Sequence, residues 1–364
     1  MSSISVNTIT DASGGATTSI NGFTPSVSNM AGRNRIINGD MRIDQRNAGA
    51  AVTDHQAYPV DRWQKIGTPS ASLQRSTTAP SGFTNSLLLT VTATGDASST
   101  LRIQQHIEGF NVSDLGWGTA SAQNVTVSFS VNCSVTGTYS LRFSNSDGNR
   151  VYFATFVVNS ANTWEYKTLT IPGDTTGTWL TNNGRGISLA FVVAGATAAT
   201  PNAWGTTGTS ATGQINLCLT NGATFYITGV QLEEGSVATP FCPAGGGSYG
   251  AELALCQRYY WRTSGGGGSL APTHMVGFYA YSGSSVGQGY CAHPVTMRAN
   301  PTSTISSLSL WNGSSVAVTS IAATNSSTIA GTLNLTTGSG SLSGYYNLIS
   351  PSSGIGYVDF SAEL

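Results

Sequence analysis

Hydrophobic and polar residues alternate along much of the chain, in the pattern that is typical of β-strands. In residues 125–131 (VTVSFSV) every second residue is hydrophobic, and the residues between them are Thr or Ser. Because successive side chains of a strand point to opposite faces, this segment predicts a strand with one buried face. Residues 152–158, 164–171 and 225–232 show similar patterns, and 187–193 is hydrophobic enough to be buried on both faces.

Turn signals separate these segments. They are the stretches 147–149 (DGN), 172–174 (PGD), 183–184 (NG) and 221–222 (NG). Short alternating segments with such turns between them favour an all-β fold. For residues 34–243 we predict a β-sandwich of the jelly-roll type.

Residues 244–269 carry a different pattern, which predicts a short linker helix. Ser248 suits a helix N-cap, and Glu252 falls in the expected first turn. A hydrophobic stripe follows at spacings of four, three and four: Tyr249, Leu253, Cys256 and Tyr260. A lone helix of about a dozen residues is marginal in water. The stripe therefore packs either on the chain's own sandwich or on copies of itself, and in the second case these residues form the seam of a homo-oligomer, which we expect to be a trimer.

The two ends of the chain differ in character. Residues 270–364 alternate again and predict a small C-terminal β-sandwich, joined to the linker through the glycines at 265–268. Residues 1–33 are polar and contain too few hydrophobic residues to form a core. This segment is either a disordered tail or an extended strand that pairs with a partner's surface.

The composition limits the classes of function. Charged residues make up 9% of the 364 residues, against roughly 25% in an ordinary soluble domain. The polar surface must therefore come from uncharged residues, which suits an extracellular or assembled β protein. A net charge of −1 predicts no attraction to nucleic acids. We also expect no membrane insertion and no secretory signal at Met1–Thr8. A protein that is made in the host cytoplasm and carried in a virus particle fits both expectations.

The residues that usually carry out catalysis show no recognised arrangement. The five cysteines have no CxxC spacing, which favours free thiols, and the four histidines lie in no metal-binding motif. Glu233 and Glu234 are adjacent, so on a strand they face opposite sides and cannot flank one sugar bond. Asp40 and Asp44 share a polar segment. We expect no enzyme and no cofactor; a structural Ca²⁺ held by Asp40 and backbone carbonyls is a weaker alternative.

Aromatic residues in polar loops are the better candidates for a binding site. An aromatic ring can stack on the apolar face of a sugar while nearby Thr, Asn or Gln bond its hydroxyls. In the alternative interpretation, each ring closes one end of a sandwich. The candidates are Trp117, Trp179 and Trp204 in the central region and Trp311, Tyr345 and Tyr346 in the C-terminal region.

Several longer motifs carry a resemblance to a known family. They are residues 34–46 (NRIINGDMRIDQR), 58–63 (YPVDRW), 103–109 (IQQHIEG), 160–167 (SANTWEYK), 171–176 (IPGDTT), 227–241 (ITGVQLEEGSVATPF), 252–260 (ELALCQRYY) and 293–301 (HPVTMRANP). With them the chain resembles bacteriophage virion proteins of the tail-fibre or structural type. The resemblance covers most of the chain after residue 34.

The resemblance implies a fold and a role. The central region is similar to the jelly rolls of carbohydrate-binding modules, which implies that a first strand near Ile36–Ile43 pairs near Ile227–Leu232. Residues 8–11 are similar to virion-attachment segments, so the N-terminal segment would bind other virion proteins. The chain would then be a tail-fibre subunit that adheres to a host-surface glycan or protein. A capsid-surface fibre or decoration protein and a polysaccharide depolymerase are the alternatives.

Overall fold

The computed structural model describes residues 32–67, 71–263, 276–284, 286–306, 309–311, 315–323, 327–337, 342–349 and 357–364. The expected attachment segment thus lies outside the described residues. The chain divides into two compact units. Unit 1 holds the described residues of 32–42, 49–59 and 63–252, and unit 2 holds those of 43–48, 60–62 and 253–364. The described secondary structure is almost entirely β, which confirms the expected fold class.

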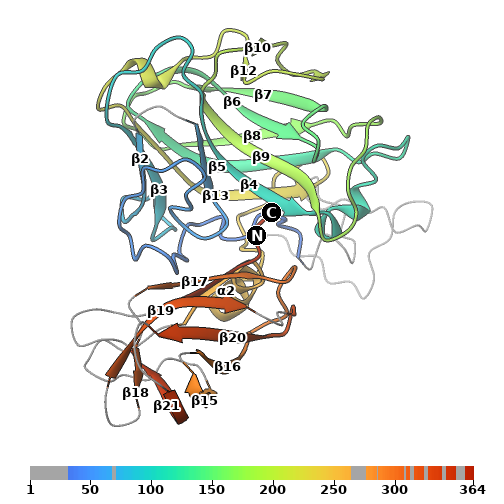
Figure 1. Ribbon diagram of the computed structural model, residues 1–364. Coiled ribbons are helices and arrows are strands. Elements are labelled where there is room, and N and C mark those ends of the chain that lie inside the picture. Colours follow the sequence, from blue (N-terminus) through green and yellow to red (C-terminus); the bar gives the residue numbers. More distant parts are fainter. Residues whose placement is uncertain are drawn as a thin grey trace, which may run out of the picture. The chain divides into compact units, whose positions relative to one another are not determined.

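Unit 1 is a sandwich of two antiparallel sheets (Figure 1). In spatial order, the six-stranded sheet consists of β1 (Gln64–Gly67), β4 (Leu101–Glu108), β9 (Arg185–Ala194), β6 (Gly137–Ser144), β7 (Val151–Val158) and β11 (Trp204–Gly205). The five-stranded sheet consists of β2 (Ala71–Ser76), β3 (Ser86–Val91), β13 (Thr224–Glu234), β5 (Val125–Cys133) and β8 (Glu165–Ile171). A short parallel pair, β10 (Ala198–Ala199) and β12 (Ser210–Ala211), is separate from both sheets.

The core of unit 1 lies between the two sheets and is rich in aromatic rings. The ring of Phe191 in β9 lies 4.9 Å from that of Phe129 in β5. The predicted strand at 125–131 is therefore confirmed, with its hydrophobic positions fully buried. On its polar face Thr126 and Ser128 are buried as well. The segment after β13 covers Thr126, whose hydroxyl donates to the carbonyl of Gly235 at 2.8 Å.

The segment near Ile36–Ile43 lies beside β13 as expected, but it is not a strand. The Arg35 N–H donates to the Leu232 carbonyl, and the Val230 N–H donates to the Gly39 carbonyl, each at 2.9 Å. Between them the backbone turns through positive φ at Asn38, which is 56°. A Cβ at Gly39 would lie 2.1 Å from the Val230 carbonyl oxygen, so this close approach requires glycine.

Unit 2 contains a small sheet and a closed barrel. The sheet runs β14 (Tyr260–Arg262), β22 (Tyr357–Ser361) and β17 (Thr302–Ser306). The barrel runs β15 (Val276–Ser284), β16 (Val286–Ala292), β20 (Ala330–Thr337), β19 (Ser315–Ala323), β18 (Ser309–Trp311) and β21 (Leu342–Ile349). We expected a small sandwich here; instead β21 pairs with both β15 and β18, which closes the sheet and leaves no free edge.

The described helices are short. They are the 3-10 helices η1 (Gly109–Asn111), η2 (Ser113–Leu115) and η3 (Leu217–Leu219) and the α-helix α2 (Tyr249–Gln257), which confirms the predicted linker helix. The division between the two units falls within α2, after Glu252. Among the described residues, no helix has the length and hydrophobicity needed to cross a membrane.

A buried carboxyl in unit 2 makes stability depend on pH. Asp61 is 1% exposed, and its Oδ1 accepts from the Gln45 N–H at 3.0 Å. Burial raises the pKa of Asp61 from 3.8 to about 6, against the opposing charge of Arg46. Because the folded pKa is the higher one, the folded chain holds this proton more tightly. The resulting stability is complete below about pH 4 and is lost as the pH rises through 6.

We expect Asp61→Asn to remove this dependence. Between pH 4 and 7 the wild type should lose about 2 kcal/mol of unfolding free energy through this group, and the variant should not. Denaturant unfolding of both proteins at pH 4, 5, 6 and 7 measures the difference. If the unfolding free energies of the two proteins changed equally with pH, Asp61 would not titrate in this range.

Candidate ligand-binding site on the six-stranded sheet

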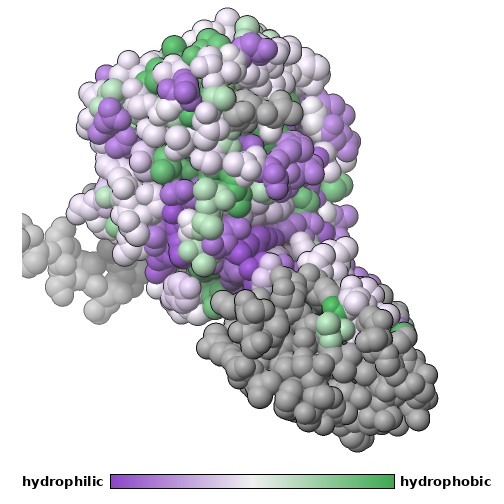
Figure 2. Space-filling view, turned by 60° about the vertical axis from the view of Figure 1, so that its left-hand side comes forward, coloured by the Kyte–Doolittle hydropathy of each residue, from purple (hydrophilic) through white to green (hydrophobic). Residues whose placement is uncertain are grey.

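One face of unit 1 carries mainly weakly polar residues (Figure 2). In Figure 2 most of its visible face is pale, and strongly hydrophilic residues gather in a band across its lower part. This distribution agrees with the low share of charged residues in the sequence. Charged side chains that gather at one place on such a surface are therefore informative.

The outward face of the six-stranded sheet has two halves. In the first half, Val151 and Phe153 of β7 and Val192 of β9 form a buried hydrophobic cluster with Ala211 of β12. Ala199 of β10 packs against this cluster. The short β10–β12 pair thus covers this half and removes it from solvent.

The second half is polar, and strand register brings its residues together. His106 of β4 lies opposite Ser188 of β9, which lies opposite Ser144 of β6. One step along, Gln104 lies opposite Ala190, which lies opposite Arg142. We call this set the arginine patch, and it comprises Gln64, Arg102, Gln104, His106, Arg142, Ser144, Arg185 and Ser188.

Hydrogen bonds hold the side chains of the arginine patch in place. The Gln104 amide donates to Gln64 Oε1 at 3.0 Å, and His106 Nδ1 lies 2.6 Å from the Ser188 hydroxyl. Gln104, His106 and Ser188 are buried, whereas Arg102 and Arg142 are half-buried. The patch therefore has a fixed polar floor, and Arg102 and Arg142 are more exposed than that floor. Such an arrangement can bind a polar ligand with little loss of side-chain entropy.

The structure brings together the three central tryptophans that the sequence singled out. Trp117 follows η2, Trp179 lies between β8 and β9, and Trp204 is in β11. Their ring centroids are 4.8, 5.4 and 5.6 Å apart and meet edge to face. Trp117 and Trp179 are 6% and 8% exposed, which matches the interpretation that they close the end of the sandwich. Only Trp204 is half-buried and offers ring surface to a ligand.

The indole N–H groups of this cluster are already in use. Trp117 donates to the Gln123 carbonyl at 2.8 Å, Trp179 to that of Thr176 at 3.1 Å, and Trp204 to that of Pro172 at 3.0 Å. The three bonds fix the rings and leave no indole donor for a sugar hydroxyl. The glycan role of these tryptophans stays a prediction, and the geometry favours Trp204 for it.

An ion pair between buried Asp174 and half-buried Arg150 supports the loops of the tryptophan cluster. Arg150 contacts Asp174 through two hydrogen bonds, from Nε to Oδ2 at 2.7 Å and from Nη2 to Oδ1 at 2.8 Å. The Arg150 guanidinium carbon also lies 5.9 Å from the centre of the Trp204 ring. The pair thus joins the 172–179 loop to the residue before β7 and to β11.

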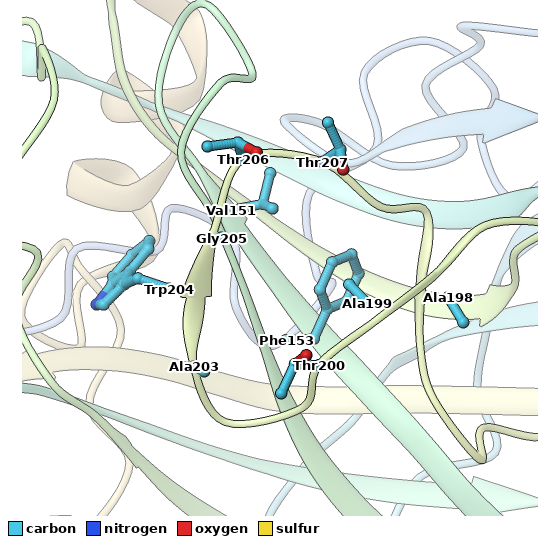
Figure 3. Close-up of a pocket in the computed structure, with 10 residues that line it drawn as sticks. All are labelled: Val151, Phe153, Ala198, Ala199, Thr200, Ala203, Trp204, Gly205, Thr206 and Thr207. Carbon is cyan, nitrogen blue, oxygen red and sulfur yellow. The ribbon is translucent and has the colours of Figure 1, made fainter.

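A pocket of about 360 Å³ lies beside β11. Its lining includes Val151 and Phe153 of β7, and Thr200, Thr206 and Thr207 from the loops around β11. In Figure 3 the indole of Trp204 extends away from Phe153 and Ala199, on the other side of β11. The pocket therefore presents Thr hydroxyls, whereas its aromatic rings offer little face for sugar stacking, because Phe153 is 1% exposed and the Trp204 indole extends to the other side of β11.

The C-terminal candidates are placed by backbone only. Trp311 is in β18, and Tyr345 and Tyr346 are in β21. In the barrel, Tyr345 pairs with Tyr279, and Tyr346 pairs with Phe278. Their side chains are outside the described part of the chain, so their role stays a prediction.

The candidate oligomer seam does not form one helical stripe. The helix α2 ends at Gln257, so Tyr260 lies in β14 instead. Tyr260 is 3% exposed, and its hydroxyl donates to Asp359 at 2.6 Å within unit 2. Cys256 is also buried and Leu253 is half-buried, which leaves Tyr249, at 52% exposure, as the accessible member. The spacing continued past the helix because sequence periodicity does not mark where a helix ends.

Asp40, the candidate calcium ligand, is buried and forms an ion pair with Arg42. Burial raises the pKa of Asp40 against the effect of this neighbour. Its Oδ1 is buried with no hydrogen-bond partner. Within the described ranges, no group of three or more His, Cys, Asp or Glu residues could hold a metal ion. Arg42 is therefore the cation that the structure places at Asp40.

Comparison with known proteins adds little about function. The chain matches no family model and no curated protein. Among solved structures it is similar to the enzymatically active domain of tailspike protein 4 of bacteriophage CBA120, with 14% identity, a TM-score of 0.33, and 56% of this chain aligned to 21% of that chain. The chain thus spans about a fifth of that domain.

Two carbohydrate-binding modules show a similar level of likeness. TmCBM61, in complex with β-1,4-galactotriose, has 11% identity and a TM-score of 0.30 over 56% of this chain and 99% of that chain. The family 11 module of a Clostridium thermocellum cellulase has 10% identity and a TM-score of 0.27 over 52% and 97%. Likeness at this level does not establish a function for this chain.

Proposed function

We propose that the chain is a bacteriophage virion protein, a tail-fibre subunit whose unit 1 binds a host-surface glycan through the arginine patch. The virion assignment is supported by the sequence motifs that resemble phage structural proteins. The observation that carries the glycan assignment is the hydrogen-bonded set of Gln104, His106 and Ser188 on an outward sheet face. Polar side chains held in this way match the donors and acceptors of sugar hydroxyls.

Adhesion does not require a tight single site. Several copies of the chain on one particle raise the effective concentration of the second binding event, so weak sites give strong attachment. We therefore keep a trimer as the expected assembly, with Tyr249 as its accessible seam residue. Attachment to other virion proteins through residues 1–33 belongs to the same proposal, and mounting on the capsid surface instead of the tail is the second candidate.

We propose a binding role without catalysis. Glu233, one of the two adjacent acids in the sequence, is buried. Its carboxylate accepts from the Thr239 N–H at 2.8 Å and from the Thr239 hydroxyl at 2.7 Å. These bonds give Glu233 a structural role in the segment after β13. A polysaccharide depolymerase would need two carboxyl groups on either side of one sugar bond.

The first test is a single substitution in the patch. Gln104→Ala removes the amide that links Gln64 and His106, and we expect about tenfold weaker binding to host cells and to purified host polysaccharide. Thr168→Ala is the matched control, because Thr168 is an exposed polar residue of β8 in the other sheet. Equal binding by Gln104→Ala, Thr168→Ala and the wild type, with unchanged unfolding temperatures, would exclude the patch as the site.

A further inference from the structure

The patch contains three arginines from three different strands. Arg102, Arg142 and Arg185 come from β4, β6 and β9, and none of them forms an ion pair with a described residue. Arg102 Nε donates to Gln104 Oε1 at 3.1 Å, and Arg142 Nη1 donates to the Ser144 hydroxyl at 2.8 Å. Arg185 donates to the backbone carbonyl of Ser146. All three bonds go to uncharged acceptors.

The arginines act on one another through their charges. Burial, together with the charges of Arg102 and Arg185, lowers the pKa of Arg142 to about 10. Burial and the charge of Arg185 also lower the pKa of Arg102. At neutral pH the groups nevertheless stay protonated, so the folded chain holds like charges together in a partly desolvated place. An arrangement of this kind costs free energy that a bound anion would offset.

The nearby acids lie toward one end of the patch. Asp147 acts electrostatically on Arg185, and Glu108 lies opposite Arg185 in the pairing of β4 with β9. No carboxylate contributes to the pKa of Arg102 or Arg142. The positive charge is therefore least compensated between these two side chains. In addition, Arg185 Nε is buried and has no hydrogen-bond partner.

We propose that the arginine patch binds an anionic saccharide, with the oxyanion of the sugar held between Arg102 and Arg142. This inference rests on the proposed function and narrows it to acidic glycans. The planar guanidinium fork can bind a carboxylate, sulfate or phosphate group through two parallel N–H···O bonds. Gln104 lies two residues along β4 from Arg102 and in the same register row as Arg142. Its amide nitrogen contacts Gln64 and His106, and its Oε1 accepts from Arg102 Nε, so it holds Arg102 in position.

Binding to matched acidic and neutral sugars tests the proposal. The full-length chain is titrated calorimetrically with oligogalacturonate, with its fully methyl-esterified form, with dextran sulfate and with a phosphorylated mannan. We expect at least one acidic sugar to bind ten or more times more tightly than neutral sugars. We also expect this binding to weaken as salt is raised, because exposed charges are screened. The acidic sugar that binds identifies the oxyanion.

Substitutions locate the site. Arg142→Gln should weaken acidic binding at least tenfold, and Arg142→Lys should weaken it less, because it keeps the charge but loses the fork. Lys167→Gln, in β8 of the other sheet, removes the same charge and should bind as the wild type does. If Arg142→Gln does not fold, the arginine Nε–Hε signals of the wild type, followed by NMR during titration, replace it; unchanged signals on saturation would overturn the proposal.

The remaining outcomes separate this inference from the proposed function. Tighter binding of the methyl ester or of a neutral host glycan, with Arg142→Gln equal to the wild type, would overturn the anionic ligand and leave glycan adhesion intact. A chain that binds none of the sugars and no host polysaccharide would overturn both.

Discussion

Replacement of Phe191 by Ala should lower the unfolding free energy of unit 1 by about 4 kcal/mol. Phe191 is fully buried in β9, and its ring lies 4.9 Å from Phe129 and 6.0 Å from Trp63. The side chain thus joins the two sheets at the centre of the sandwich. Its removal loses the transfer free energy of the ring and leaves a cavity that the flanking strands cannot close.

Urea unfolding followed by tryptophan fluorescence measures this change, since most tryptophans belong to unit 1. Phe110→Ala is the matched control, because Phe110 is 59% exposed and its loss should change stability by no more than about 0.5 kcal/mol. If the two variants unfolded at the same urea concentration, Phe191 would not be a core residue. Its side chain would then not lie on the face of β9 that packs between the two sheets.

The second prediction with a large effect concerns the ion pair between Arg150 and Asp174. Asp174→Ala should cost about 3 kcal/mol, because it leaves the Arg150 guanidinium without its partner and removes the acceptor of the Thr176 N–H. Asp174 is 1% exposed. Trp204 fluorescence should change as well, since Arg150 lies over its ring. Asp114→Ala breaks a single-contact pair with Arg35 in which Asp114 is 40% exposed, and should cost less than about 1 kcal/mol.

The cost of Asp174→Ala should depend on pH in a defined direction. Burial opposes ionisation of Asp174, but hydrogen bonds from Arg150 and Thr176 outweigh it and lower its pKa below 3.8. Because the folded pKa is the lower one, the stability that the carboxylate supplies is present above pH 3.8 and is lost as the pH falls through the folded pKa. Unfolding at pH 7 and at pH 3 should therefore show a smaller difference from the wild type at the lower pH. A constant difference would mean that the charge of Asp174 has no part in the effect.

The strands of unit 1 could be predicted from local pattern, and their partners could not. Residues 125–131 alternate strictly and form β5, and 187–193 is continuously hydrophobic and lies in β9, buried on both faces. The outward face of β9 is buried because the β10–β12 pair covers part of it, and only the fold shows this. Residues 36–43 were expected to be a strand, yet they run beside β13 in turns.

For the candidate site, too, the sequence identified single residues and the fold brought them together. The tryptophans were identified one by one from their loops, but only the fold placed 117, 179 and 204 in contact and buried two of them. The arginine patch was missed, although the alternation of Gln104 and His106 in the motif at 103–109 was a local signal that one face of this strand is polar. That motif gives no information about Arg142 or Arg185, which lie in other strands.

By itself, the sequence determined that the chain is β-rich, that its surface is polar with few charges, and which positions of most strands are hydrophobic, because these properties depend on neighbouring residues alone. The tertiary structure decided that Arg102, Arg142 and Arg185 meet, since the sheet order β4-β9-β6 places strands side by side that are far apart along the chain. It also decided that residues 43–48 and 60–62 belong to unit 2. Such pairings follow from the packing of whole sheets, and no local alternation of residues encodes them.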